Sequence, residues 1–324
     1  MSSPALTVVL FTRTSYEVLR RTMRHLRAQT VREQLEVLIT APVGAQVRPD
    51  AGALDGFAHA EIIEVGQVET LAAAQVAGIE RATAPVVVIG EDHSFPETGW
   101  AAALIAAHRQ DVAAVGAAVG NANPRTLTRW GNYIPYFGGW TASRPAGFAE
   151  QLPGHNTAYK RAVLRHYRDQ LTFFLAVEGI FHQQLRQDGY QLYFEPAART
   201  QHVNFSRFGW FTLQSLSGAR LYGGSRAARE CWPWSRRLFY IAGSPLIPVV
   251  RLRRMIASMR QCEEQRRWLP RLLPVLVWGA LFHAWGEITG YALGVGDAEK
   301  RCLDFETDRL RYVTAADREE LAEH

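Results

Sequence analysis

The residues from Val86 to His93, Val86-Val87-Val88-Ile89-Gly90-Glu91-Asp92-His93, indicate the fold of this chain. The first four are β-branched and apolar, which is typical of a short strand buried on both faces of a sheet. Three ionisable side chains, those of Glu91, Asp92 and His93, follow after one glycine. Because open α/β sheets bind ligands beyond the carboxyl ends of their strands, this order predicts a central strand that leads into a binding site.

Strands and helices are expected to alternate on both sides of this strand, which predicts an α/β fold with a mostly parallel sheet flanked by helices. Apolar runs of strand length lie at Leu6 to Phe11, Leu35 to Ile39, Ile62 to Val65, Val112 to Val119 and Gln191 to Phe194. Helical patterns lie at Tyr16 to Gln29 with Ser15 as N-cap, Leu71 to Arg81, Trp100 to His108, Lys160 to His166 and Val177 to Gln187. Between them, the residues from Gly120 to Pro153 are expected to form a long functional loop.

Composition allows one large domain with an appendage, because the chain has 324 residues, of which 48% are hydrophobic and 21% charged. We place the first domain at residues 1–207, a C-terminal helical segment at 208–300 and a tail at 301–324. The cysteines Cys231, Cys262 and Cys302 lack the spacing of a metal or redox site and are expected to be reduced thiols in a cytosolic compartment. The apolar stretch Val8 to Phe11 has no basic region before it, so we expect no secretory signal.

The C-terminal helical segment combines frequent arginines beyond Arg226 with two apolar runs, Leu238 to Val250 and Leu272 to Val295. Nucleic acid is one surface that arginine binds, but the interleaved aliphatic and Trp residues favour anionic lipid, so no nucleic-acid partner is expected. The second run has the length of a bilayer span, yet it contains His283 and Glu287, which are costly in lipid. We therefore expect an interfacial or re-entrant hairpin on the cytoplasmic face of the cell membrane. A true span and an ordinary helical subdomain packed on the first domain are the alternatives.

The residues after the central strand have the chemistry of a metal site. On an extended segment, Glu91 and His93 point to one side and Asp92 to the other. Glu91 and His93 could then share one divalent metal ion, which would neutralise a diphosphate and stabilise it as a leaving group. Alternatively, one of the two could bind the metal while Asp92 holds a ribose. The alternative is a solvated acidic turn without a ligand.

Across roughly residues 5 to 205, the order of these pieces resembles the inverting family 2 glycosyltransferases, which have the GT-A fold. In that family a strand and helix like Val8 to Gln29 begin a nucleotide-binding half, and a helix like Leu71 to Arg81 leads into an apolar strand that ends in a D-x-D motif. The residues from Glu91 to His93 match that motif. The resemblance implies that Glu91 and His93 hold Mn²⁺ or Mg²⁺ and that Thr12, Arg13 and Asp92 contact a UDP- or GDP-sugar.

Three further matches extend this resemblance. Gly154-His155-Asn156-Thr157-Ala158-Tyr159-Lys160-Arg161 resembles the family segment Gly-x-Asn-x-Ala-x-Arg-Arg, which implies that His155, Asn156 and Lys160 contact the donor. Counting back from Gly189 places Glu178 on the catalytic acid, where a helix-terminal glutamate without a catalytic role is the alternative. His202 follows a strand and a Pro-x-Ala turn and matches a histidine that reaches the metal or the pyrophosphate in many members. A purely structural His202 is equally compatible with the sequence.

The resemblance therefore implies an inverting, metal-assisted glycosyltransferase of the hexosyl-transferring type (EC 2.4), active in glycan biosynthesis. The arginine-flanked apolar runs from Leu238 to Val295 favour a glycan or lipid-linked acceptor at the membrane. The chain departs from the family pattern in two ways: Leu38-Ile39-Thr40-Ala41-Pro42 stands where acidic residues usually close the second strand, and His93 is unusual in the motif. A catalytically degenerate GT-A protein that binds nucleotide or acts as a scaffold at the membrane is therefore the alternative. A dinucleotide-binding domain is disfavoured because no G-x-G-x-x-G follows the first strand.

Overall fold

The computed structural model describes residues 3–323, with helices and strands close to the predicted positions. The strands are β1 (Leu6–Phe11), β2 (Leu35–Ala41), β3 (His59–Glu64), β4 (Val86–Ile89), β5 (Ser94–Pro96), β6 (Ala114–Asn121), β7 (Gly147–Phe148), β8 (Ala158–Lys160) and β9 (Leu192–His202). The α-helices are α1 (Arg20–Arg27), α2 (Leu71–Arg81), α3 (Trp100–Ala107), α4 (Leu127–Phe137), α5 (Arg161–His166), α6 (Leu171–Ala176), α7 (Glu178–Gln187), α8 (Phe208–Arg229), α9 (Trp234–Gly243), α10 (Leu246–Gln261), α11 (Glu263–Leu293), α12 (Ala298–Glu306) and α13 (Ala315–Glu323).

The chain divides into two compact units. Unit 1 contains the residues up to 120, residues 140–202 and the tripeptide Glu306–Asp308. Unit 2 contains residues 121–139, 203–305 and those from 309 onward. The tripeptide thus belongs to unit 1, although the residues on both sides of it in the sequence belong to unit 2. The domain boundaries expected after residues 207 and 300 remain predictions.

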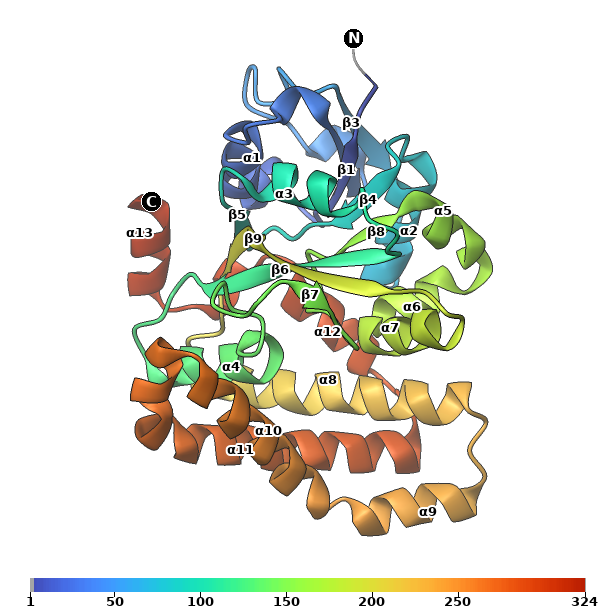
Figure 1. Ribbon diagram of the computed structural model, residues 1–324, viewed down its shortest axis with the longest axis vertical. Coiled ribbons are helices and arrows are strands. Elements are labelled where there is room, and N and C mark those ends of the chain that lie inside the picture. Colours follow the sequence, from blue (N-terminus) through green and yellow to red (C-terminus); the bar gives the residue numbers. More distant parts are fainter. Residues whose placement is uncertain (1–2, 324) are drawn as a thin grey trace. The chain divides into compact units, whose positions relative to one another are not determined.

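Unit 1 is built on a curled sheet flanked by helices (Figure 1). Its strand order is β3-β2-β1-β4-β8-β6-β9-β5, and β7 pairs with β9. β1 pairs in parallel with β2 and β4, and β2 with β3. The pairs β4–β8, β6–β8, β5–β9 and β7–β9 are antiparallel. The sheet is therefore mixed, and the predicted parallel arrangement describes the half that contains β1 and β4.

Side chains that alternate along the parallel strands explain how helices cover this half. Leu6, Val8 and Leu10 of β1 belong to one buried cluster with residues of α1 and α3, including Met23 and Trp100. The next residue along the strand points to the opposite face. On that face α2 contacts β1 and β2. Strands buried on both faces have a near-continuous apolar sequence, which is why the sequence alone indicates β1, β2 and β4.

Two local predictions need correction. Ser15 precedes the 3₁₀ helix Tyr16–Leu19, and its side chain makes no capping hydrogen bond. The residues expected to form one long loop contain α4 (Leu127–Phe137), whose glycine and proline are poor helix formers. Its buried side chains nevertheless recur at helical spacing, at Trp130, Tyr133, Ile134 and Phe137. That periodicity was the available signal for the helix.

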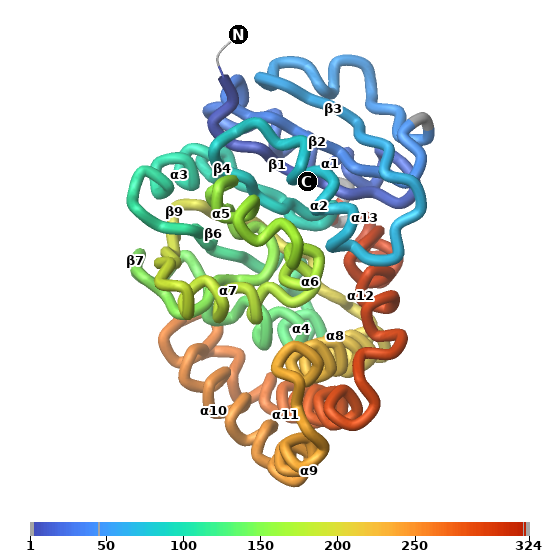
Figure 2. Tube along the Cα trace, turned by 90° about the vertical axis from the view of Figure 1, so that its right-hand side faces the viewer, coloured from blue at the N-terminus to red at the C-terminus, as the bar shows by residue number. Residues whose placement is uncertain are grey.

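Unit 2 is helical, and its longest helices, α8 and α11, run side by side in both views (Figures 1 and 2). A Cβ on Gly286 would lie 2.3 Å from the carbonyl oxygen of Leu216, and one on Gly290 would lie 2.6 Å from that of Arg220. Both glycines therefore allow the two backbones to approach closely. By length and composition α11 could cross a membrane, but 44% of its most apolar window is buried within the protein.

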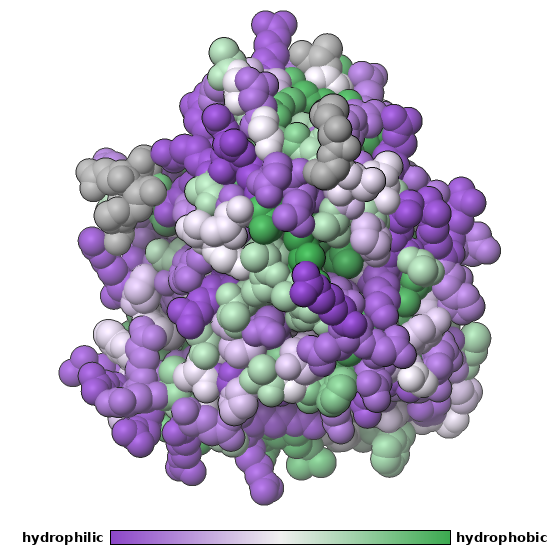
Figure 3. Space-filling model, turned by 45° about the horizontal axis from the view of Figure 1, so that its top comes forward, coloured by the Kyte–Doolittle hydropathy of each residue, from purple (hydrophilic) through white to green (hydrophobic). Residues whose placement is uncertain are grey.

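His283 and Glu287, the charged or titratable residues expected to be costly in lipid, pair with each other inside α11. Glu287 lies 3.1 Å from His283 through its Oε1 atom and accepts a hydrogen bond of 2.5 Å from the hydroxyl of Tyr291 through Oε2. Because these groups satisfy one another, Glu287 is compatible with a helix that is partly buried in protein. Elsewhere on the molecule, hydrophilic side chains cover most of the face in Figure 3, and hydrophobic ones show in small areas.

Two histidines of unit 1, His108 and His182, are buried. His108 lies 3.2 Å from the carbonyl oxygen of Ala158, and His182 lies 2.9 Å from the hydroxyl of Tyr159. Burial lowers the pKa of His108 and of His182 to about 4. A depressed histidine pKa stabilises the fold above the unfolded pKa, and this contribution is lost as pH falls toward the folded pKa.

We therefore expect the free energy of unfolding to fall as the pH is lowered from about 7 to about 4, with each histidine contributing at most about 3 kcal/mol. In the variant His108→Asn, the free energy of unfolding should depend less steeply on pH than in the wild type. Urea unfolding followed by fluorescence measures this free energy at each pH. The nearby exposed Gln110 serves as a control, since Gln110→Asn replaces one group that does not titrate by another and should leave the slope unchanged. Identical slopes for His108→Asn and the wild type would contradict a neutral His108.

Candidate active site

The turn after β4 is held in place by unit 1 itself. The hydroxyl of Thr22 in α1 lies 3.1 to 3.3 Å from the carbonyl oxygens of Glu91, Asp92 and Ser94. Asp92 and His93 form a turn rather than the extended segment that was expected. The backbone geometry of this turn places all three ionisable side chains where they can interact.

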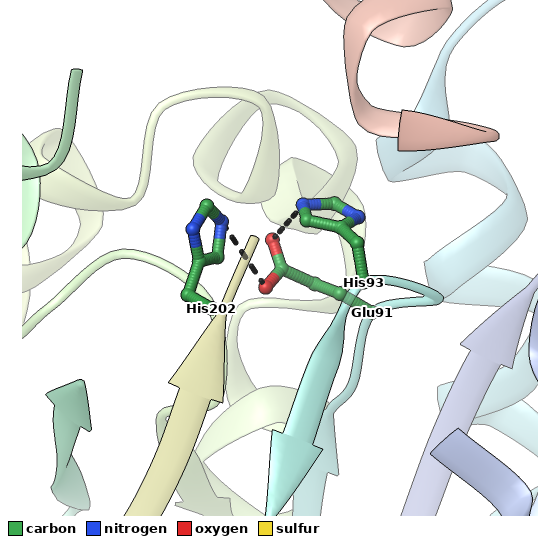
Figure 4. Close-up of side chains that lie close together, drawn as sticks. All are labelled: Glu91, His93 and His202. Atoms are coloured by element: carbon green, nitrogen blue, oxygen red, sulfur yellow. Dashed lines mark ion pairs between the residues drawn. The ribbon is translucent and has the colours of Figure 1, made fainter. Parts of the chain in front are cut away.

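The side chains of Glu91, His93 and His202 converge (Figure 4). His93 Nε2 lies 3.5 Å from Glu91 Oε1, and His202 Nε2 lies 3.9 Å from Glu91 Oε2. The two imidazole rings stand edge to face, with centroids 4.8 Å apart. His202 ends β9 and pairs with Ser94 of β5, so the register of these antiparallel strands brings it beside the turn. All three residues are buried.

Asp92 orients His93. Its Oδ1 atom lies 2.6 Å from His93 Nδ1, and its Oδ2 atom accepts a hydrogen bond of 2.7 Å from the backbone N–H of Asp308. With the proton of the neutral ring on Nδ1, the lone pair of Nε2 faces Glu91 and His202. Such carboxylate–histidine pairs fix the tautomer of metal-binding histidines. Asp92 was expected to hold a ribose, but in the structure both its oxygens make these contacts.

The segment before β8 contributes His155 and Asn156, both with left-handed backbone at φ values of 62° and 53°. This conformation is rare for residues other than glycine and costs about 1 kcal/mol or more, so it persists only where the surroundings impose it. Asn156 Nδ2 donates to Glu91 Oε2 at 3.1 Å and to the Ser94 hydroxyl at 3.0 Å. That hydroxyl donates to the same carboxylate oxygen at 2.7 Å. Glu91 is therefore fixed through its Oε2 atom.

Glu178, the first residue of α7, lies on the other side of His155. Its Oε2 atom accepts a hydrogen bond of 2.6 Å from the backbone N–H of His155. The Nδ1 atom of His155 lies 3.8 Å from this oxygen and 3.6 Å from Glu91 Oε1. Burial raises the pKa of the Glu178 carboxyl, and the neighbouring His155 partly opposes this shift. A raised carboxyl pKa is what a residue needs to accept a proton near neutral pH.

The structure does not bring every predicted residue to this cluster. Lys160 pairs with Val86 at the opposite end of β4 and its ammonium group lies 3.1 Å from Asp111. Thr12 is buried after β1, where its hydroxyl donates to the carbonyl oxygen of Ser15, and Arg13 is exposed beside it. Both follow a strand parallel to β4 and lie at the same edge of the sheet as Glu91.

The sequence did not indicate Ser94, which holds Glu91, or two residues from a distant segment. The tripeptide Glu306–Asp308 of unit 1 places Glu306 Oε2 3.6 Å from His93 Nε2, and its Asp308 donates to Asp92 as described. These residues are more than 200 positions from the turn after β4. No local pattern marks them, because neither periodicity nor a motif connects segments so far apart.

The residues of this cluster fit a divalent cation. Ligand atoms of Glu91, His93 and His202 lie within 4.8 Å of one another, and the same holds for Glu91, His155 and Glu306. Among the described residues, Glu91 Oε1 and His93 Nε2 are buried without a hydrogen-bond partner. Leaving such groups unsatisfied costs about 1 to 3 kcal/mol each. Carboxylate oxygen and imidazole nitrogen are suitable donors for a metal of the Mn²⁺ type, which would satisfy both atoms.

Comparison with known proteins supports the fold. No protein-family model matches the sequence, and no curated protein matches it. The chain is similar to a mannosyltransferase from Pyrobaculum calidifontis solved with GDP-Man and Mn²⁺, at 16% identity over 88% of each chain and a TM-score of 0.50. GalNAc-T7, solved with UDP, GalNAc and Mn²⁺, has 13% identity and a TM-score of 0.46, over 61% of this chain and 43% of the GalNAc-T7 chain. The chain thus spans less than half of GalNAc-T7.

The likeness to the mannosyltransferase confirms the predicted fold class: the chain has the GT-A fold. In this chain, a mixed sheet is flanked by helices, and a long apolar helix, α11, lies toward the C-terminus. The site described above lies within unit 1, which contains the whole sheet apart from Asn121, the last residue of β6.

The hydrogen bond between Asp92 and His93 yields a test. In Asp92→Asn, a single neutral amide oxygen replaces two carboxylate oxygens, so it can accept from only one of the two present donors and orients His93 less firmly. We expect Mn²⁺ binding, measured by isothermal titration calorimetry, to weaken by roughly 10- to 100-fold. Asp111→Asn, which changes an exposed carboxylate of unit 1, should bind as the wild type does. Unchanged affinity in Asp92→Asn would contradict the orienting role.

Proposed function

We propose that the protein is a metal-assisted, inverting glycosyltransferase that moves a sugar from a nucleotide-diphosphate donor to an acceptor hydroxyl. The observation that carries this proposal is the buried cluster at the end of β4, where Glu91, His93 and His202 converge and His155 links them to Glu178. The GT-A fold, and the GDP-Man and Mn²⁺ of the similar mannosyltransferase, support a sugar nucleotide as the donor. A UDP- or GDP-sugar is the class we propose.

The metal-binding residues in this proposal are Glu91, His93 and His202. A divalent cation bound there would neutralise the developing charge on the diphosphate leaving group. Asn156 and Ser94 hold Glu91 in position, and Asp92 holds His93. These contacts fix the ligands before substrate binds, so little reorganisation is needed when charge develops.

Glu178 is the proposed general base. It would accept the proton of the acceptor hydroxyl while the oxygen attacks the anomeric carbon on the face opposite the departing phosphate, which inverts the configuration. Val177 precedes it, so this position carries a single carboxylate, which suffices for removal of one proton. Because burial raises the pKa of Glu178, turnover should rise with pH as this carboxyl loses its proton.

Substitution of this base tests the mechanism. Glu178→Gln should lower sugar transfer by roughly 10²- to 10⁴-fold, the usual contribution of a general base. Donor binding should remain, because the amide keeps the shape of the side chain and can still accept a hydrogen bond from His155. Turnover is measured with UDP- and GDP-sugars in Mn²⁺, and Glu150→Gln provides an exposed control within unit 1.

Two outcomes would count against this mechanism. If Glu178→Gln turned over the donor as fast as the wild type, Glu178 would not be the general base. If the wild type binds a nucleotide diphosphate in a Mn²⁺-dependent thermal-shift assay but turns over no donor, the chain is a degenerate binding module rather than a transferase.

We also propose that unit 2 binds the cytoplasmic face of the cell membrane, where the acceptor would be a glycan or lipid-linked alcohol. No residue of α9 is buried, yet the helix carries Trp234, Leu238 and Phe239, which are 62%, 59% and 74% exposed. Arg236 and Arg237 lie between these apolar residues. This combination suits insertion into the interface of an anionic bilayer, where apolar side chains enter the lipid and arginines contact the headgroups.

Further exposed apolar residues of unit 2 lie on α10 and α11: Leu246, Val249, Val250, Leu273, Trp278, Leu281, Trp285 and Leu293. Individually such residues are common on protein surfaces. Their concentration on consecutive helices that are also rich in arginine supports the choice of an anionic lipid surface as the partner.

Vesicle binding tests this proposal. The wild-type protein should sediment with vesicles that contain phosphatidylserine, and the double variant Trp234→Ser, Phe239→Ser should sediment severalfold less because it loses two of the apolar side chains that enter the lipid. Phe148→Ser, which removes an aromatic side chain of unit 1 that is 65% exposed, should bind like the wild type. A wild-type protein that stays in the supernatant would exclude the membrane partner.

A further inference from the structure

The tripeptide Glu306–Asp308 contributes a carboxylate to the cluster at the end of β4. Glu306 Oε2 lies 3.6 Å from His93 Nε2, the nitrogen that Asp92 leaves with its lone pair exposed to the cluster. The side chain of Glu306 is 16% exposed, so it is largely shielded from water. Ligand atoms of Glu306, Glu91 and His155 also lie within 4.8 Å of one another.

The charges in this arrangement call for a cation. Two carboxylates, of Glu91 and Glu306, approach the same imidazole nitrogen from different segments, and like charges so close together in a buried site repel each other. Among the described residues, no hydrogen bond satisfies Glu91 Oε1 or His93 Nε2, and the latter atom lies 3.6 Å from Glu306. A cation between these groups would satisfy both atoms and offset the repulsion.

The backbone of the tripeptide is held at the same place. The N–H of Asp308 donates to Asp92 Oδ2 at 2.7 Å, and Asp308 has a left-handed backbone with φ of 54°. The carboxylate of Asp92 therefore connects the tripeptide to the ring of His93. One short segment thus places the side chain of Glu306 near His93 and its backbone against Asp92, the residue that orients His93.

We propose that Glu306 is a fourth protein ligand of the divalent cation, in addition to Glu91, His93 and His202. This inference rests on the proposed metal-assisted function and extends it to a segment distant in sequence. Four protein ligands leave positions for donor oxygens on an ion that prefers six. Cation binding also holds the tripeptide Glu306–Asp308, so metal occupancy and the order of this segment are coupled.

The test measures Mn²⁺ binding to the full chain by isothermal titration calorimetry without nucleotide. Glu306→Gln should weaken Mn²⁺ binding by about tenfold or more, because a neutral amide is a poor ligand and the second carboxylate is lost. Glu306→Asp, which keeps the charge, should bind more tightly than Glu306→Gln. The matched control Glu319→Gln, an exposed glutamate later in the chain, should bind as the wild type does.

Two further measurements distinguish a ligand from a structural residue. Without metal, Glu306→Gln should unfold at the same or a higher temperature than the wild type, because one of two facing carboxylates is gone. With Mn²⁺, hydrogen exchange at residues 306–308 should slow in the wild type and change little in Glu306→Gln. A variant that is destabilised without metal but binds Mn²⁺ with wild-type affinity would overturn the proposal.

The failure of this inference can be told from failure of the proposed function. If the wild type and Glu306→Gln bind Mn²⁺ equally and both transfer sugar, Glu306 is not a ligand while the proposed function stands. If the wild type binds no Mn²⁺ at all, the metal site itself is wrong, and the metal-assisted function falls with it.

Discussion

The hydrogen bond from His93 Nδ1 to Asp92 determines what the rest of the site can do. It directs the lone pair of His93 Nε2 toward Glu91, and it requires the tight turn that Thr22 holds after β4. Glu91 is fixed separately by Asn156 and Ser94, which contact one carboxylate oxygen and leave the other facing the histidine. Two buried polar atoms without hydrogen-bond partners among the described residues are the result, and they face each other across 3.5 Å.

The topology of unit 1 explains why residues from several segments meet there. β4 ends at the turn, β5 pairs with the end of β9 at His202, and β8 runs antiparallel to β4 so that the residues before it lie beside Glu91. The backbone N–H of Asn156 donates to the carbonyl oxygen of Ile89, which secures this approach. A helix N-terminus then places Glu178 next to His155. The parallel half of the sheet provides the rigid base, and antiparallel strands deliver the remaining side chains.

Much of this arrangement was predictable from the sequence because apolar runs mark buried strands, and polar residues at their ends mark a site. The strand β4 and the convergence of Glu91, His93 and His202 followed from such patterns and from a family resemblance. Lys160 shows the limit: the motif matched it, but an antiparallel β8 rising about 3.3 Å per residue carries it to the far end of β4. Glu306 was beyond reach, since only tertiary structure brings it to His93.

The most direct measurement of the central claim is the anomalous scattering of crystals grown with Mn²⁺. A single strong peak bonded to Glu91, His93 and His202 is the predicted result, because those residues present the ligand atoms that the surrounding hydrogen bonds leave available. A map in which Mn²⁺ binds elsewhere, while His93 and Glu91 keep their present positions without it, would contradict the account.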